Sequence, residues 1–198
     1  MKQKENKKIK ISSILLILLV IAAIALIICI SIVITKRNKN EREVKEVIAE
    51  VSENLQEDPE AQIPYIDYDG YQVIGTIKIE KINIEYPILT ESTEESLKKS
   101  ICRFGNGKVN EIGNLCLAGH NYLNGVFFGK ANKLENGDEI SITDLHGNEV
   151  IYKVFDKYIT DPNDVSILNS VKEGRREITL VTCINGNKDR LIIKASEI

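Results

Sequence analysis

The sequence predicts a mainly β domain, either a barrel or a sandwich, behind an N-terminal helix that crosses a membrane. Residues 11–35 are almost wholly apolar and carry no charge. From residue 71 to the C-terminus, β-branched runs of strand length recur, with only brief helical signals between them. Many short strands over about 130 residues are typical of barrels and sandwiches.

The apolar segment 11–35 is long enough to be a transmembrane anchor, since about 20 such residues cross a bilayer. The preceding tail, 1–10, is short and holds five lysines, so we expect it to be cytoplasmic. A long domain is translocated largely regardless of its charge, which places the following domain outside the cell. A cleaved signal peptide is the alternative, because Ala23-Ile24-Ala25 has the small-x-small form. The apolar run continues to Ile34, which favours the uncleaved anchor.

The charge of the exterior part disfavours one class of partner. The first 35 residues hold five lysines and one glutamate, a surplus of four positive charges, so the net charge of −3 becomes −7 for the rest. An acidic domain argues against nucleic acid as a partner. The basic residues that flank the apolar segment are instead expected to contact membrane lipid.

A charged segment, 36–64, follows the membrane and is predicted to be a helical linker. Its apolar residues recur with helical spacing on one face, at Val44, Val47, Ile48, Val51 and Leu55. This face is compatible with an arm that packs on the domain or with a spacer. Pro59 and Pro64 then mark the start of the folded domain, 65–198.

The elements of the domain follow from runs of β-branched residues and from turn signals. The predicted strands are 71–79, 82–89, 114–118, 138–144, 148–159, 177–183 and 190–195. Ser92-x-x-Glu95 is a capping-box pattern that predicts a short helix to Lys99, and 163–169 suits a second one. We expect strands 138–144 and 148–159 to form a hairpin, with His146 exposed to solvent in the turn between them.

Of the four cysteines, Cys29 lies in the apolar segment and the other three in the domain. An odd number leaves at least one thiol unpaired. A Cys102–Cys116 disulfide is possible, but two free buried thiols are the favoured interpretation. With no C-x-x-C spacing and only two histidines, a structural zinc site is not expected.

Three residues form a candidate catalytic set. Cys183 ends an apolar run; alone it suits a small buried residue, but its polar neighbours place the thiol at a strand-to-loop junction. His120 also follows a strand, and an imidazole exchanges protons near neutral pH. Arg190 begins the last strand, so a hairpin would set it beside Cys183, where a guanidinium can bind an oxyanion.

These residues resemble a known family once their order is considered. Papain-like enzymes place Cys before His, and caspases carry a Gln-Ala-Cys signature that is absent here. Residues 179–183, Thr-Leu-Val-Thr-Cys, resemble the TLxTC motif of sortases, the membrane-anchored transpeptidases of Gram-positive cell surfaces. Gly119-His120 and residues 190–192 match the other two sortase sites in order, and the resemblance covers roughly 65–198.

The resemblance implies an eight-stranded sortase-type β-barrel with one or two short helices. It implies a thiol transpeptidase in which Cys183 attacks an LPxTG-like sorting signal, His120 transfers protons and Arg190 holds the oxyanion. Thr182 would help to bind substrate. The implied partners are surface proteins with such a C-terminal signal and an amine acceptor, such as a peptidoglycan cross-bridge or a pilin lysine.

The resemblance leaves class and cofactor as separate questions. The compact stretch from Tyr158 to Glu177 is similar to class D sortases, whereas residues 119–129 have class B-like features; the loop from Cys183 to Arg190 is short for the family. No cofactor and no metal are predicted. Calcium is used by some sortases, but scattered carboxylates usually form a solvated face; those available are Glu91, Glu94, Glu95, Glu111 and Asp161. A thiol hydrolase on the same scaffold and a non-catalytic surface module are the alternative functions.

Overall fold

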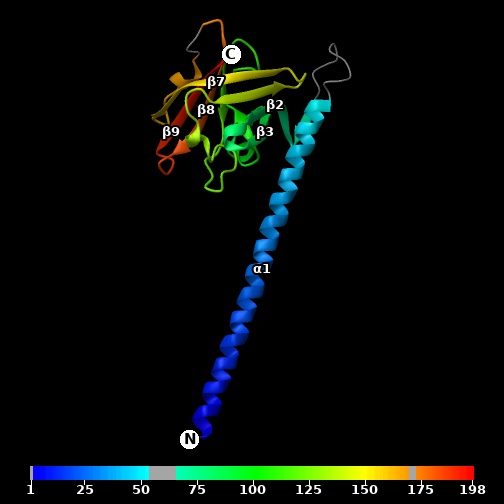
Figure 1. Ribbon diagram of the computed structural model, residues 1–198, viewed down its shortest axis with the longest axis vertical. Helices are drawn as coiled ribbons and strands as arrows, with labels where there is room; N and C mark the ends of the chain where they lie inside the picture. The colour runs from blue at the N-terminus through cyan, green and yellow to red at the C-terminus, as the bar shows by residue number, and fades with distance from the viewer. Residues whose placement is uncertain (1, 54–65, 170–172) are drawn as a thin grey trace. The chain divides into compact units, whose positions relative to one another are not determined.

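The computed structural model describes residues 2–53, 66–169 and 173–198 (Figure 1). The chain divides into two compact units, Met1–Glu43 and Val44–Ile198. Helix α1, Lys2–Glu53, supplies all of the described first unit and the start of the second. The predicted boundary near Pro59 and Pro64, and with it Leu55 of the apolar face, lies outside the described residues.

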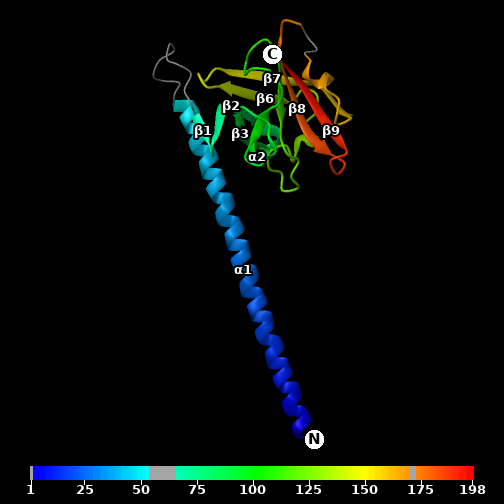
Figure 2. The same cartoon turned by 180° about the vertical axis from the view of Figure 1, so that it is seen from behind.

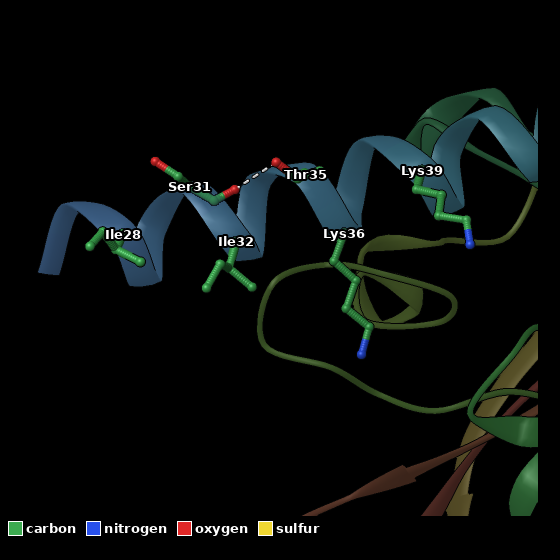
Figure 3. A pocket seen from close by; sticks show the side chains of 6 residues that line it. All are labelled: Ile28, Ser31, Ile32, Thr35, Lys36 and Lys39. Carbon is green, nitrogen blue, oxygen red and sulfur yellow. Dashed lines mark hydrogen bonds between the residues drawn. The ribbon is translucent and has the colours of Figure 1, made fainter. Parts of the chain in front are cut away.

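The first unit is helical and contains a long apolar stretch. Among the described residues one helix is long and apolar enough to cross a membrane, over Leu15–Lys36 with a mean hydropathy of 3.5. The two hydroxyls near the C-terminal end of this span bond back to their own helix: Ser31 Oγ donates to Ile27 O at 2.9 Å and Thr35 Oγ1 to Ser31 O at 2.8 Å. This pairing lets hydroxyls sit in an apolar medium. Figure 3 shows Ser31 and Thr35 on the helix, with the first basic side chains following.

The second unit is a closed barrel of eight strands, as the family resemblance implied. The strands are β2 (Tyr71–Ile79), β3 (Ile84–Leu89), β4 (Ile101–Arg103), β5 (Gly113–Ala118), β6 (Glu139–Asp144), β7 (Glu149–Thr160), β8 (Arg176–Ile184) and β9 (Asp189–Glu197). Their order is β2-β3-β4-β5-β8-β9-β7-β6, and a β2–β6 pairing closes the ring (Figures 1 and 2). A ninth strand, β1 (Ile66–Tyr68), adds to the start of β2.

A bulge in β2 permits this closure. The register of β2 against β3 shifts between Val73 and Gly75. Gly75 has φ of +156°, and a Cβ there would lie 2.5 Å from the backbone oxygen of Thr143 on β6. Only glycine allows the backbones to approach so closely, so Gly75 makes room for β2 to pair with β6.

The short helices lie where the sequence placed them but differ from the prediction in two details. Helix α2 (Glu94–Leu97) is capped by Thr93, so the capping box begins one residue later than the predicted Ser92. Thr93 Oγ1 accepts from Ser96 N at 3.1 Å, while Ser96 Oγ accepts from Thr93 N at 2.9 Å. Ser96 is fully buried and supplies the return bond that the exposed Glu95 was expected to make. The predicted helix at 163–169 is the single 3₁₀ turn η4 (Ser166–Leu168), and two more 3₁₀ turns are η2 (Glu80–Ile82) and η3 (Ala131–Lys133).

The barrel interior and the last turns of α1 bury separate apolar clusters. Ile77, Leu117, Ile140 and Leu180 are among the residues that fill the barrel. Val44 and Val47 of α1 are also buried, in a second cluster that contains Tyr68 and Leu89. The end of α1 is therefore an arm packed on the domain, which is one of the two alternatives that the sequence left open.

Candidate active site

The candidate catalytic residues share one level of the sheet because of its register. Strands β5 and β8 are parallel, with Ala118 opposite Val181, and Gly119 N continues the ladder by donating to Val181 O at 3.2 Å. Extending this register by two residues sets His120 level with Cys183. On the other side of β8, Cys183 is directly opposite Arg190 of β9. The sheet therefore orders the three residues as His120, Cys183 and Arg190.

The three side chains also point to the same face. Directly paired residues face the same side of a sheet, and residues two apart along a strand do so as well. Val181, and so Cys183, are on the outer face of the barrel, while Leu180 points into the core. Cys183, His120 and Arg190 are all partly exposed. We call this set of three the catalytic row.

Two side chains bind the segment of His120 to the segment of Cys183. Thr182 Oγ1 donates to Gly119 O at 2.7 Å, and Asn121 Nδ2 donates to Cys183 O at 2.9 Å. Together with the backbone bond to Val181 O, these bonds connect residues 119–121 to residues 181–183 at three successive points. The relative position of imidazole and thiol is therefore set by hydrogen bonds at the ends of two strands.

Thr182, whose part in substrate binding stays a prediction, is buried in the structure. Its side chain is only 4% exposed, because the alternation of β8 turns it toward the interior. Its hydroxyl is already bonded to Gly119 O. Thr182 is thus placed to hold the residue before His120, and its effect on a substrate would be indirect.

A tight loop with aromatic side chains carries His120. An isolated bridge joins Asn121 to Phe127, and Phe128 N donates to His120 O at 3.1 Å. The Tyr122 ring lies 5.0 Å from the His120 ring and 5.9 Å from that of Phe127. Phe127 holds a φ of +52°, which is uncommon for a bulky residue and is maintained by its burial.

Gly119 lies tightly against the ring of Phe128. A Cβ at this position would lie 2.8 Å from Cδ2 of the buried Phe128 ring. Packing therefore requires glycine before His120, whereas the backbone conformation at this position does not.

The β8–β9 hairpin places Arg190. Asn185, Gly186 and Asn187 all have positive φ, which lets a four-residue turn join Ile184 to its partner Asp189. Arg190 Nη1 donates to the backbone oxygens of Asn187 and Asp189, each at 3.2 Å. The turn thus fixes one edge of the guanidinium through its own carbonyls.

The other two domain cysteines are free and buried, as favoured from the sequence. Cys102 donates to Ser96 Oγ at 3.5 Å and Cys116 to Ile167 O at 3.4 Å. Burial raises the pKa of each of these thiols to about 11. A thiol held neutral in this way is a poor nucleophile, so neither cysteine competes with Cys183 for a catalytic role.

The sequence named the catalytic row but missed the residues that support it. Asn121 and Tyr122 stand in the segment that carries the resemblance, yet an exposed Asn and Tyr after a strand are ordinary loop residues. Their contacts became visible only with the parallel β5–β8 register. The other histidine, His146, is exposed at the β6–β7 turn, as predicted.

No metal centre is apparent in the part of the chain that the structure describes. Groups of three or more His, Cys, Asp or Glu side chains arranged to hold an ion are not found there. The expectation that the protein needs no cofactor stays a prediction.

Comparison with known proteins identifies the family of this chain. The sortase domain model matches residues 77–198. Sortase A of Bacillus anthracis is 33% identical over 136 residues, which are 67% of this chain and 63% of the relative. Sortase D of Bacillus subtilis (strain 168) is 29% identical over 113 residues, 57% of this chain and 54% of the relative.

A solved structure shows the same relationship. The Clostridium perfringens sortase D5 transpeptidase superposes with a TM-score of 0.65 at 32% identity, covering 80% of this chain and 98% of that one. The chain therefore belongs to the sortase family. The matched region spans less than two thirds of the length of the two curated relatives. Relatives from both class A and class D are similar, so the class D-like assignment stays a prediction.

Proposed function

We propose that this protein is a membrane-anchored cysteine transpeptidase that cleaves an LPxTG-like sorting signal and transfers the acyl part to an amine. One observation supports this most directly: His120, Cys183 and Arg190 lie at one level and on one face of three adjacent strands. Membership of the sortase family supports the reaction class.

In the first step, the Cys183 thiolate attacks the carbonyl carbon of the scissile peptide bond. The C–S bond forms, and the carbonyl oxygen becomes an oxyanion for which Arg190 provides N–H donors. As the C–N bond breaks, His120 gives a proton to the leaving amine. The product is a thioester on Cys183 and a free C-terminal fragment of the sorting signal.

In the second step, an incoming amine attacks the thioester carbonyl. His120, now neutral, accepts a proton from this amine as the new C–N bond forms. The C–S bond breaks, and the thiolate is regenerated. Two acyl transfers replace one direct amide exchange, which is the advantage of a covalent intermediate. The acceptor would be a peptidoglycan cross-bridge amine or a pilin lysine.

Hydrolysis is the competing outcome on the same scaffold. Cys183 is partly exposed, so water can reach a thioester at this position. The balance between water and amine depends on how well the acceptor is bound.

The single apolar helix at the N-terminus supports attachment to the membrane. We propose a cytoplasmic N-terminus and an extracellular catalytic domain, with Lys36 and Lys39 close to lipid head groups. Protease added to intact cells should then remove the domain but leave the N-terminal tail, detected with an N-terminal tag. Protection of the domain would contradict this orientation.

The full-length chain in detergent micelles tests the reaction. It is mixed with a library of sorting-signal peptides and with glycine or diamine acceptors, in calcium-free buffer with EDTA. Acceptor-linked product supports the proposal, and cleavage without linkage supports the hydrolase. No product from the library, with an intact thiol at Cys183, would contradict both. Activity that appears only after calcium is added would contradict the proposed independence of metal.

A further inference from the structure

A second row of side chains on the outer sheet face suggests an additional role. The register sets Cys116 of β5 opposite Thr179 of β8, Thr179 opposite Lys194 of β9, and Lys194 opposite Asp156 of β7. Along β8, Thr179 of this row lies four positions before Cys183 of the catalytic row. Between them lies an apolar row with Val181 and Ile192.

The segment between β7 and β8 covers both the row of Thr179 and Lys194 and the row of Val181 and Ile192. We refer to residues 161–169 of this segment as the β7–β8 connection. Ile167 and Leu168 of η4 pack on Val181 and Ile192, which are 8% and 0% exposed. Val181 and Ile192 are each two residues from the catalytic row. The connection therefore covers the outer face of the sheet up to the residues next to the catalytic row.

Buried polar side chains hold the backbone of this connection. Asn114 Nδ2 donates to Ile167 O at 2.9 Å and to Asn169 O at 3.4 Å. Lys194 Nζ donates to Asn169 O at 3.3 Å, and Thr179 Oγ1 orients the Asn114 amide by donating to its Oδ1 at 2.9 Å. Asn114 and Lys194 are 9% and 6% exposed.

The chemistry of these donors favours one position of the connection. A buried amide or amine N–H is costly to leave without an acceptor, and the acceptors here are the carbonyl oxygens of the connection. Asp164 adds attraction from the same segment: hydrogen bonds from Ser166 and Thr160 lower its pKa, and the nearby Lys194 lowers it further. If the connection moved outward, these donors would lose their partners.

We propose that Lys194 and Asn114 form a polar clamp that positions the β7–β8 connection, and that this clamp determines how tightly the peptide substrate binds beside the catalytic row. The inference rests on the proposed transpeptidase function for its substrate. Lys194 touches none of the reacting groups, so it is a positioning residue. Its loss weakens substrate binding and leaves the chemical step largely intact.

The test compares Lys194→Met, which keeps the length of the side chain but removes the donor, with Lys194→Arg, which retains donors. Lys153→Met is the matched control, because Lys153 is an exposed lysine on the neighbouring strand β7. In the full-length chain in micelles we expect Lys194→Met to raise KM about tenfold with kcat within about twofold. Lys194→Arg should have a KM between those of Lys194→Met and the parent, and Lys153→Met should have the KM of the parent.

Hydrogen exchange provides a readout that does not require activity. The amides of Leu168 and Asn169 bond within η4, to Val165 O and Ser166 O. Their exchange rates should rise at least about fivefold in Lys194→Met and stay at the parent values in Lys153→Met. If Lys194→Met does not fold, Asn114→Ala removes the other donor and carries the same expectations.

The outcomes separate the two proposals. Unchanged exchange and unchanged KM in both clamp variants would overturn the clamp while leaving the transpeptidase intact. Lack of transfer by the parent protein would overturn the transpeptidase, and the exchange rates would still decide whether the clamp exists. A fall in kcat with no change in KM or exchange would also contradict the clamp.

Discussion

Cys116 and Cys183 lie on the same outer face of two neighbouring strands, yet their surroundings are opposite. Cys116 is 1% exposed, covered by the β7–β8 connection, and bonded to Ile167 O. Cys183 lies on β8, four positions beyond Thr179, the residue that pairs with Cys116. The β7–β8 connection does not cover Cys183, which is partly exposed beside His120 and Arg190. The comparison shows that cover and neighbours, rather than residue type, decide which thiol is accessible.

The covered and open ends also use hydrogen bonds differently. At the covered end, side chains of β5 and β9 hold the backbone of the β7–β8 connection. At the open end, Thr182 and Asn121 hold the strand ends to each other, and none of the described residues forms a hydrogen bond with the Cys183 thiol. The first arrangement buries polar groups; the second sets the spacing of reactive groups that remain accessible.

The largest expected effect comes from removing each thiol in turn. Cys183→Ala should lower the rate of acyl transfer by about ten-thousandfold or more, because no other group can form the thioester. Cys116→Ala, the matched control from the covered end, should retain the parent rate within about threefold. Initial rates with a sorting-signal peptide and an amine acceptor measure both. Comparable losses in the two variants would erase the distinction between the two ends.

The second effect concerns the cation of the catalytic row. Arg190→Lys should reduce kcat/KM about a hundredfold, since an ammonium cannot reproduce the planar set of donors toward an oxyanion. Lys194→Arg is the reverse exchange, from lysine to arginine, at the covered end. It serves as a control, and we expect only a small loss of kcat/KM. Full activity of Arg190→Lys would remove Arg190 from the proposed mechanism.

The third prediction tests the covered end through pH. In the folded protein burial raises the pKa of Cys102 and Cys116 from 9.0 to about 11. Between these values the unfolded chain binds fewer protons than the folded one, so the free energy of unfolding falls as pH rises. We expect a loss of about 2 kcal/mol for each thiol by pH 11.

Urea unfolding at pH 8 and pH 11 measures this loss. Cys116→Ala should show a smaller decline than the parent, because one of the two thiols is gone. Some decline should remain, since Cys102 stays and burial also raises the pKa of Tyr152 to about 12. An identical decline in parent and variant would show that Cys116 is not held neutral by the fold.

The sequence predicted the regular parts of this molecule because their signals are local. Alternating β-branched residues identified β2 in full, and the turn at His146 identified the β6–β7 hairpin. Strands β1 and β4 were missed because three residues are too short to show alternation. The placement of Arg190 opposite Cys183 was also predictable, since a short hairpin joins the two strands. The catalytic roles of Cys183, His120 and Arg190 stay predictions.

What the sequence could not predict depends on contacts between distant segments. The parallel pairing of β5 with β8 joins residues more than 60 positions apart, and no turn signal encodes it. The bond from the Thr182 hydroxyl to Gly119 O was therefore not predicted. The role of Lys194 was hidden for the same reason, because a lysine on a strand is normally a solvent-facing residue.

The smallest expected effect tests the bond that joins the two halves of the open end. Asn121 Nδ2 donates to the carbonyl oxygen of Cys183 itself, and the side chain is exposed. Asn121→Ala should lower kcat about tenfold, the equivalent of one lost hydrogen bond, with little change in the unfolding midpoint. Asn121→Asp should be as poor or worse, because a carboxylate oxygen would face the carbonyl oxygen and repel it. Asn124→Ala, in the same loop, is the control and should retain the parent kcat. If Asn121→Asp kept full activity, the hydrogen bond would not be what holds His120 and Cys183 in register, and the backbone ladder to Val181 would have to suffice.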